Sequence, residues 1–111
     1  NNKMSCQYLV TLNCPNDLDF DIENWLLEHI EEMLKIEGFE NATLWKEELE
    51  ENNNGNVIYH ADYRLKDRAA LQNYFDKHAA KMRGVLNEDV KQKIQFSRKI
   101  SVAIETNNKK K

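Results

Sequence analysis

Two histidines occupy positions on predicted helices where their imidazole rings could do chemistry. His29 in WLLEHIEEML borders the apolar stripe of its segment, and His78 in YFDKHAAKM falls inside a similar stripe. An imidazole titrates near neutral pH and can transfer protons, so two such rings facing one cavity would suit acid–base chemistry. The ordinary alternative is packing, with each ring hydrogen-bonded to a carbonyl or carboxylate, because a buried unpaired N–H costs about 1–3 kcal/mol. The spacing of the residues leaves both interpretations open.

The functional alternative is a small-molecule pocket between helices and sheet. Such pockets are mostly apolar and contain a few convergent polar groups. The residues that could form one here are Trp25, His29, Tyr74, His78 and Arg98. Neither helix carries a carboxylate or a third histidine at a metal-ligand spacing. The sequence also has no zinc motif, glycine-rich phosphate loop or Ser-His-Asp set, so we expect no metal and no cofactor.

A second polar set alternates along a predicted strand. His60, Asp62 and Arg64 are two residues apart and therefore share one face of that strand. Trp45, on the preceding strand, could lie on the same face if the register allows it. A large aromatic ring among polar groups suits a dimer interface, so these four residues form our candidate dimer face. A solvated ladder of side chains and a site built across the dimer are the alternatives.

Composition indicates a single domain over residues 5–105, with flexible termini at 1–4 and 106–111. No segment approaches the roughly 20 apolar residues of a membrane span, and none reads as a secretory signal. Cys6 and Cys14 would stand about 26 Å apart on one continuous strand, at about 3.3 Å per residue, too far for a disulfide. Free thiols suit the reducing cytoplasm, which is the predicted location.

The net charge of −3 hides an uneven distribution. Residues 17–51 contain 13 acidic and 2 basic side chains, whereas residues 64–99 contain 10 basic and 4 acidic ones. Such a division can mark a binding surface, or it can reflect two neighbouring elements that attract each other. The second explanation is the simpler one.

Hydrophobic periodicity predicts the elements that must position these residues. Apolar, partly β-branched segments predict strands at 6–13 and 96–104. Alternating apolar and polar residues predict a third strand at 57–65. A fourth strand, which begins after Gly38, would pair with it through a turn at Asn54-Gly55. Apolar residues at helical spacing predict one helix from Asp19 or Asp21 to Gly38 and another from Asp67 to Gly84. Residues 85–94 are ambiguous and could form a short helical turn.

The order β-α-β-β-α-β predicts an α+β, ferredoxin-like fold, in which a four-stranded antiparallel sheet carries two helices on one face. The acidic and basic helices would then be neighbours. The other face of the sheet has no partner within the chain, so we expect a homodimer in which two sheets pack into an α/β barrel.

Several segments resemble a family of small bacterial cytosolic proteins classed as a domain of unknown function. The resemblance lies in Trp25, His29-Ile30, Gly38-Phe39, the tyrosines 59 and 63, Tyr74 with His78-Ala79, and Phe96 with Arg98. It spans roughly residues 8–104 and departs at LNEDVKQKIQ, where the family tends to place an Arg-Phe pair and glycines. The resemblance implies the dimeric α/β-barrel fold and brings no established activity.

The leading hypothesis is therefore a cytoplasmic homodimer that binds a small apolar or aromatic molecule between helices and sheet. Whether it is an enzyme stays open, and cofactor-free monooxygenase chemistry is suggested only by analogy of fold. An RNA-recognition-like module shares this element order, but Tyr59 and Tyr63 alternate with the polar set and the chain is acidic overall. We therefore expect neither nucleic acid nor a membrane as partner. A protein–protein interaction domain is a further alternative.

Overall fold

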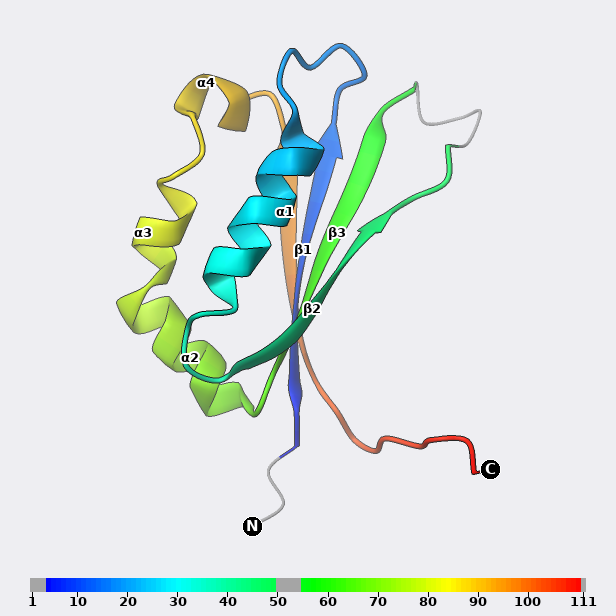
Figure 1. Cartoon of the computed structure of the whole chain (residues 1–111), viewed down its shortest axis with the longest axis vertical. Helices are drawn as coiled ribbons and strands as arrows, with labels where there is room; N and C mark the ends of the chain where they lie inside the picture. Colours follow the sequence, from blue (N-terminus) through cyan, green and yellow to red (C-terminus); the bar gives the residue numbers. More distant parts are fainter. Residues whose placement is uncertain (1–3, 50–54, 111) are drawn as a thin grey trace.

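The computed structural model describes residues 4–49 and 55–110, and within these ranges the predicted order of elements is confirmed (Figure 1). The strands are β1 (Cys6–Cys14), β2 (Phe39–Lys46), β3 (Val57–Leu65) and β4 (Gln95–Val102). The helices are α1 (Ile22–Met33), α2 (Arg68–Lys77), α3 (Ala79–Arg83) and α4 (Glu88–Lys91). The predicted second helix is thus divided in two, and the ambiguous segment contains the short helix α4.

The four strands form one sheet in the order β2-β3-β1-β4, and every neighbouring pair is antiparallel. Tyr8 at the centre of the sheet lies opposite Tyr63 of β3 and Ile100 of β4. Residues directly opposite each other share a face, so the register assigns each side chain to the helix side or to the other side. This topology confirms the predicted ferredoxin-like α+β fold.

All four helices lie on one face of the sheet, and the core is between them (Figure 1). The alternation predicted for β3 is present, since Tyr59 and Tyr63 are buried whereas Arg64 is exposed on the opposite face. Aromatic rings fill much of the core: Phe39 and Tyr74 have ring centroids 5.4 Å apart, in edge-to-face contact. Each buried large apolar side chain stabilises the fold by roughly 1.5–3 kcal/mol.

Helix α1 follows the predicted apolar stripe but ends earlier than expected. Asp21 begins it, because its carboxylate accepts a hydrogen bond from the backbone N–H of Asn24 at 3.1 Å. The helix ends at Met33 rather than at Gly38, because the chain tightens into turns in which Ile36 N–H donates to the Met33 carbonyl. Gly38, with φ +92°, instead shapes the turn into β2.

The second predicted helix breaks at His78. The carboxylate of Asp67 caps its start by accepting a hydrogen bond from Ala70 N–H at 2.8 Å. At His78 the backbone leaves the helical region, with φ −128° and ψ −27°, so α2 and α3 are separate helices. Backbone hydrogen bonds from His78 N–H to the Tyr74 carbonyl and from Met82 N–H to the His78 carbonyl keep the spacing of a helix across the break. The apolar residues therefore keep helical periodicity, and the sequence pattern does not show the break.

Charges of opposite sign meet where α1 lies beside α3. Lys35 lowers the pKa of the Glu32 carboxyl most strongly, through a hydrogen bond, and Lys81 of α3 lowers it further through its charge. The uneven charge distribution therefore partly reflects neighbouring helices.

Of the predicted Asn54-Gly55 turn, Asn54 lies outside the described residues. No helix in the described part of the chain is long and apolar enough to cross a membrane.

Candidate functional site

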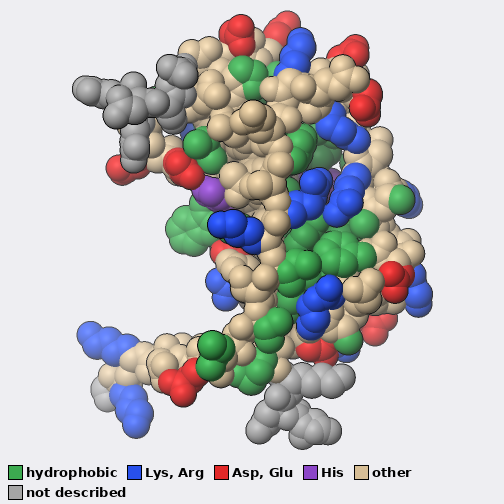
Figure 2. Space-filling view, turned by 180° about the vertical axis from the view of Figure 1, so that it is seen from behind, with side chains coloured by type: hydrophobic (Ala, Val, Ile, Leu, Met, Phe, Trp, Pro, Cys, Tyr) green, Lys and Arg blue, Asp and Glu red, His purple; other side chains and the backbone are tan. Residues whose placement is uncertain are grey.

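A cavity of about 240 Å³ lies between the helices and the sheet. Aromatic and aliphatic side chains make up most of its wall, among them Tyr8, Trp25, Met82 and Phe96. Figure 2 shows the back of the molecule, where hydrophobic side chains gather in the middle and Lys and Arg side chains lie around them. The polar groups of the wall come from four different elements, α1, α3, α4 and β4, together with tyrosines of the sheet and α2.

Four of the five residues predicted for the pocket line this cavity. Trp25, His29, Tyr74 and Arg98 lie in its wall, although they come from α1, α2 and β4. His78 does not line this cavity, so the structure separates it from Tyr74 and Arg98 but not from Trp25 and His29. His78 lies in a second hollow between α1 and α3, together with Trp25 and His29 and beside Glu32 and Lys81.

Trp25 and His29 form one wall of the cavity as a stacked pair. They are four residues apart on α1 and therefore neighbours on the same helix face. Their ring centroids are 4.5 Å apart and their planes differ by 13°. Burial lowers the pKa of the His29 imidazole below its ordinary value of 6.5, although the charge of Glu32 acts in the opposite direction. The ring is therefore neutral at pH 7 and can accept a proton.

Tyr74 contributes a buried phenol. Its ring packs against Tyr8 and Phe39, with centroid distances of 5.9 and 5.4 Å. Burial is the main reason why the pKa of its hydroxyl is raised to about 12, and the hydroxyl therefore stays protonated at neutral pH. A protonated phenol in an apolar wall is a hydrogen-bond donor.

The sequence did not reveal four further polar residues of the cavity, Tyr8, Tyr63, Arg83 and Lys91. Arg83 donates a hydrogen bond to the Tyr8 hydroxyl at 3.2 Å, and Lys91 donates one to the Arg83 backbone carbonyl at 2.6 Å. Both basic residues belong to the basic region of the sequence. The positive charge of that region was the only signal in the sequence. The short helices α3 and α4, which place these residues at the cavity, are too short to show a periodicity of their own.

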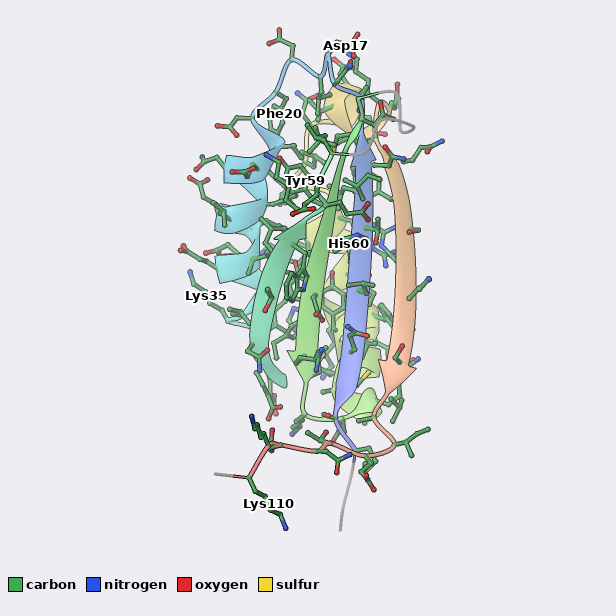
Figure 3. The ribbon with its side chains drawn as sticks, turned by 90° about the vertical axis from the view of Figure 1, so that its right-hand side faces the viewer. Asp17, Phe20, Lys35, Tyr59, His60 and Lys110 are labelled. Carbon is green, nitrogen blue, oxygen red and sulfur yellow. The ribbon has the colours of Figure 1, made fainter. Side chains whose placement is uncertain are left out.

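On the opposite face of the sheet, the register places Trp45, His60, Asp62 and Arg64 together. Figure 3 shows the sheet from this side, with His60 labelled on β3. Asp62 is 8% exposed and is the centre of this set. Its carboxylate accepts hydrogen bonds from Gln7 at 2.9 Å, from Arg64 at 3.3 Å and from the Trp45 indole at 3.3 Å. Burial alone would raise the pKa of Asp62, but these donors and the Arg64 charge together lower it.

His60 belongs to a different hydrogen-bond chain on that face. Its Nδ1 lies 2.7 Å from the Thr11 hydroxyl and its Nε2 lies 2.6 Å from the Glu47 carboxylate. The imidazole is therefore fixed by β1 on one side and by the chain after β2 on the other. Within residues 4–49 and 55–110, no group of three His, Cys, Asp or Glu side chains could hold a metal ion.

Comparison with known proteins decides the family. Residues 5–104 match the family described as Domain of unknown function (DUF4286). The chain belongs to DUF4286. No curated protein matches it in sequence. The resemblance stated from the sequence is thereby confirmed.

Solved structures similar to this DUF4286 chain share its fold at low sequence identity. A Bacillus cereus protein described as a candidate antibiotic biosynthesis monooxygenase matches with a TM-score of 0.63 and 12% identity, over 96% of this chain and 99% of that one. A dimeric ferredoxin-like protein from an uncultured marine organism matches with a TM-score of 0.61 and 12% identity, over 95% of this chain and 100% of that one. A Shewanella oneidensis protein matches with a TM-score of 0.60 and 12% identity, over 92% of this chain and 93% of that one. At such identity the similarity shows the fold alone.

Proposed function

We propose that this DUF4286 chain is a cytoplasmic homodimer that binds a small apolar or aromatic molecule in the cavity between helices and sheet. The observation that carries the proposal is the cavity itself, of about 240 Å³, with Trp25 and Phe96 in its wall and the neutral imidazole of His29 among them. Natural ligand sites combine an apolar wall with a few polar groups in this way. The two buried free thiols fit a reducing compartment.

The second part of the proposal concerns the open face of the sheet, which a second copy of the chain would cover. Trp45 projects from this face with 55% of its surface exposed, although its indole N–H is already bonded to Asp62. Exposed tryptophans of this kind are typical of the energetic centre of interfaces. The marine ferredoxin-like protein of similar structure is described as dimeric, which supports the same assembly here.

Nucleic-acid binding fits this fold less well. RNA-recognition modules stack bases on aromatic rings of the open sheet face. Here Tyr59 and Tyr63 point toward the helices and are 5% and 2% exposed, so neither ring can stack on a base. A module that binds other proteins through its helices is the remaining alternative, and the ligand experiment separates it from the proposal.

Native mass spectrometry of freshly purified protein tests the ligand. We expect an additional mass of one small molecule per chain, which is lost after denaturation, and we expect Trp25→Ala to reduce its occupancy. Leu27→Ala, on the exposed side of the same helix, is the matched control. The proposal fails if the protein carries no small molecule and a screen of small aromatic compounds yields no binder.

Sedimentation equilibrium tests the dimer. The chain has a mass of 13.1 kDa, and we expect a species of twice that mass at micromolar concentration. Trp45→Ala should weaken dimerisation by about tenfold or more, because buried tryptophans at interfaces often contribute 2 kcal/mol or more. Leu27→Ala is again the control, since Leu27 is 51% exposed but lies on α1, away from the open sheet face. A monomer at high concentration would contradict the proposal.

Oxidation of the bound molecule is a second candidate function, favoured by the position of His29 in the cavity wall. The neutral imidazole could accept the proton of a bound phenol and so prepare it for reaction with O₂. With 1-naphthol as probe, one O₂ would give 1,4-naphthoquinone and one water, and the substrate itself would supply the electrons. Formation of the quinone by the native chain, and its loss in His29→Gln with binding retained, would support this function; no turnover by the native chain would exclude it for this probe.

A further inference from the structure

Three cationic side chains line the cavity, and none of its described lining residues carries a carboxylate. Arg83 ends α3, Lys91 ends α4 and Arg98 lies in β4, and all three line the same cavity. None of the described residues in the cavity wall is an aspartate or a glutamate. In a chain with an overall charge of −3, such a wall is a local concentration of positive charge.

The two arginines have no anionic partner among the residues that the structure describes. Arg83 donates its hydrogen bond to a neutral group, the Tyr8 hydroxyl at 3.2 Å. Arg98 lies over the Phe96 ring, with its guanidinium carbon 5.4 Å from the ring centroid. Within the described part of the chain, neither guanidinium forms an ion pair with an aspartate or glutamate.

Lys91 differs from the two arginines, because its ammonium group already has partners within the chain. Its ammonium group donates to the Arg83 backbone carbonyl at 2.6 Å and lies 3.7 Å from the Glu88 carboxylate. This lysine is therefore partly neutralised, and its hydrogen bond joins the end of α3 to α4. Arg83 and Arg98 are the two cations available to a ligand.

Both guanidinium groups act on the interior of the cavity. Burial is the main influence on the pKa of Tyr74, which it raises to about 12, but the charges of Arg83 and Arg98 both counteract that rise. Tyr74 itself is 2% exposed and lines the cavity. The positive charge of the two arginines therefore acts on Tyr74 in the wall against which a bound molecule would lie.

We infer that the molecule bound in this cavity is a small organic anion. Its apolar body lies against Tyr8, Trp25 and Phe96, and its carboxylate, or a similar anionic group, pairs with Arg83 and Arg98. The inference rests on the proposed function and adds the charge of the ligand to it. A volume of about 240 Å³ is slightly below the range of about 300–1,000 Å³ typical of drug-sized ligands, so the body is small, with one or two rings.

Guanidinium chemistry favours this assignment over a neutral ligand. The planar fork of donors on arginine matches the two oxygens of a carboxylate, and charge-assisted hydrogen bonds are about twice as strong as neutral ones. Arginine also stacks on aromatic rings, as Arg98 does on Phe96, which holds the group at the cavity wall while its N–H groups stay available. An anion neutralises the charge that no carboxylate of the wall neutralises.

A matched pair of probes tests the inference by isothermal titration calorimetry on the full chain. The probes are 2-naphthoate and its neutral counterpart 2-naphthamide, which share the same rings. We expect 2-naphthoate to bind about tenfold more tightly or better, and to lose this advantage as salt is raised from 50 to 500 mM. Arg98→Gln and Arg83→Gln should each weaken the binding of 2-naphthoate by about tenfold and leave the affinity for 2-naphthamide nearly unchanged.

The control is Lys99→Gln, which removes one positive charge from the next residue of the same strand. Lys99 pairs with Leu9 and so lies on the opposite face of the sheet from Arg98, which pairs with Val10. Equal affinities for the two probes, or equal losses in Arg98→Gln and Lys99→Gln, would overturn the inference while the proposed function stands. If neither probe binds, the inference fails, and the mass spectrometry and compound screen described above decide separately whether the proposed pocket stands.

Discussion

Trp25 and His29 stack face to face one turn apart on α1, with ring centroids 4.5 Å apart, and both rings line the same cavity. The indole covers one face of the imidazole and excludes water from it. This contact explains why a polar residue is tolerated beside the apolar stripe of the helix. It also explains why the pKa of the imidazole is lowered, because burial disfavours the charged form.

Acid should destabilise the protein through His29. Folding lowers the pKa of this group below 6.5, so the unfolded chain binds the proton more readily than the folded one. The free energy of unfolding should therefore fall as the pH decreases through 6.5. Urea denaturation at pH 7.5, 6.5 and 5.5 measures this fall, which should be smaller in His29→Gln. Identical pH dependence in the two proteins would show that His29 does not contribute.

A hydrogen bond between sheet and helix should stabilise the end of the core near α1. The Tyr59 hydroxyl donates a hydrogen bond to the Glu23 carboxylate at 2.9 Å, and the same carboxylate accepts one from the Lys46 ammonium group at 3.2 Å. Tyr59→Phe should lower the free energy of unfolding by about 1 kcal/mol, since Glu23 is well exposed and solvent weakens the bond.

Tyr63→Phe is the matched control for that experiment, read by urea denaturation. Tyr63 is buried like Tyr59 and lines the cavity, but its hydroxyl has no hydrogen-bond partner among the described residues. We expect this second variant to unfold at nearly the same urea concentration as the native chain. Equal losses in the two variants would mean that the bond to Glu23 contributes nothing specific.

Gly38 should be intolerant of any side chain. Its φ of +92° is rarely adopted by other residues, and an added Cβ would lie 2.5 Å from the Cβ of Ala70 on α2. We expect Gly38→Ala to lower the free energy of unfolding by about 2 kcal/mol or more. Gly84→Ala should cost less than about 1 kcal/mol, because Gly84 has a helical φ of −79°. Thermal unfolding of both variants compares the two positions.

The cysteines should be unreactive in the folded protein. Cys6 and Cys14 are both buried at opposite ends of β1, and burial raises the pKa of the Cys14 thiol to about 11. Because the thiolate is the reactive form, we expect neither residue to react with Ellman's reagent at pH 8 within minutes. Both should react at once in concentrated urea. Rapid modification of the native chain would contradict this placement.

Much of the fold could be predicted from the sequence because each element shows its own periodicity. The alternation around Tyr59 and Tyr63 and the stripe that begins at Ile22 were enough to place the sheet and the first helix. The break at His78 could not be predicted, because the apolar residues on either side of it keep helical spacing. The end of α1 at Met33 was missed for a related reason, since tight turns can continue the apolar pattern of a helix.

The candidate site was predicted less completely, because a cavity combines residues that are distant in sequence. Trp25 and His29 could be paired from their spacing on one helix, and Tyr74 and Arg98 fell into the same cavity. His78 lies instead in the neighbouring hollow, which it shares with Trp25 and His29. Arg83 and Lys91 could not be foreseen, since their positions depend on how two short helices turn back over the edge of the sheet.

One side of the cavity is lined by α3, which has five residues, by α4, which has four, and by Leu86 between them. Isolated helices of this length are unstable in water, so this flap stays folded through its few tertiary contacts, such as the bond from Lys91 to the Arg83 carbonyl. Local opening here should therefore require far less free energy than unfolding the sheet. A guest molecule could then enter from the helical side and leave the four strands, and any partner bound to their other face, undisturbed.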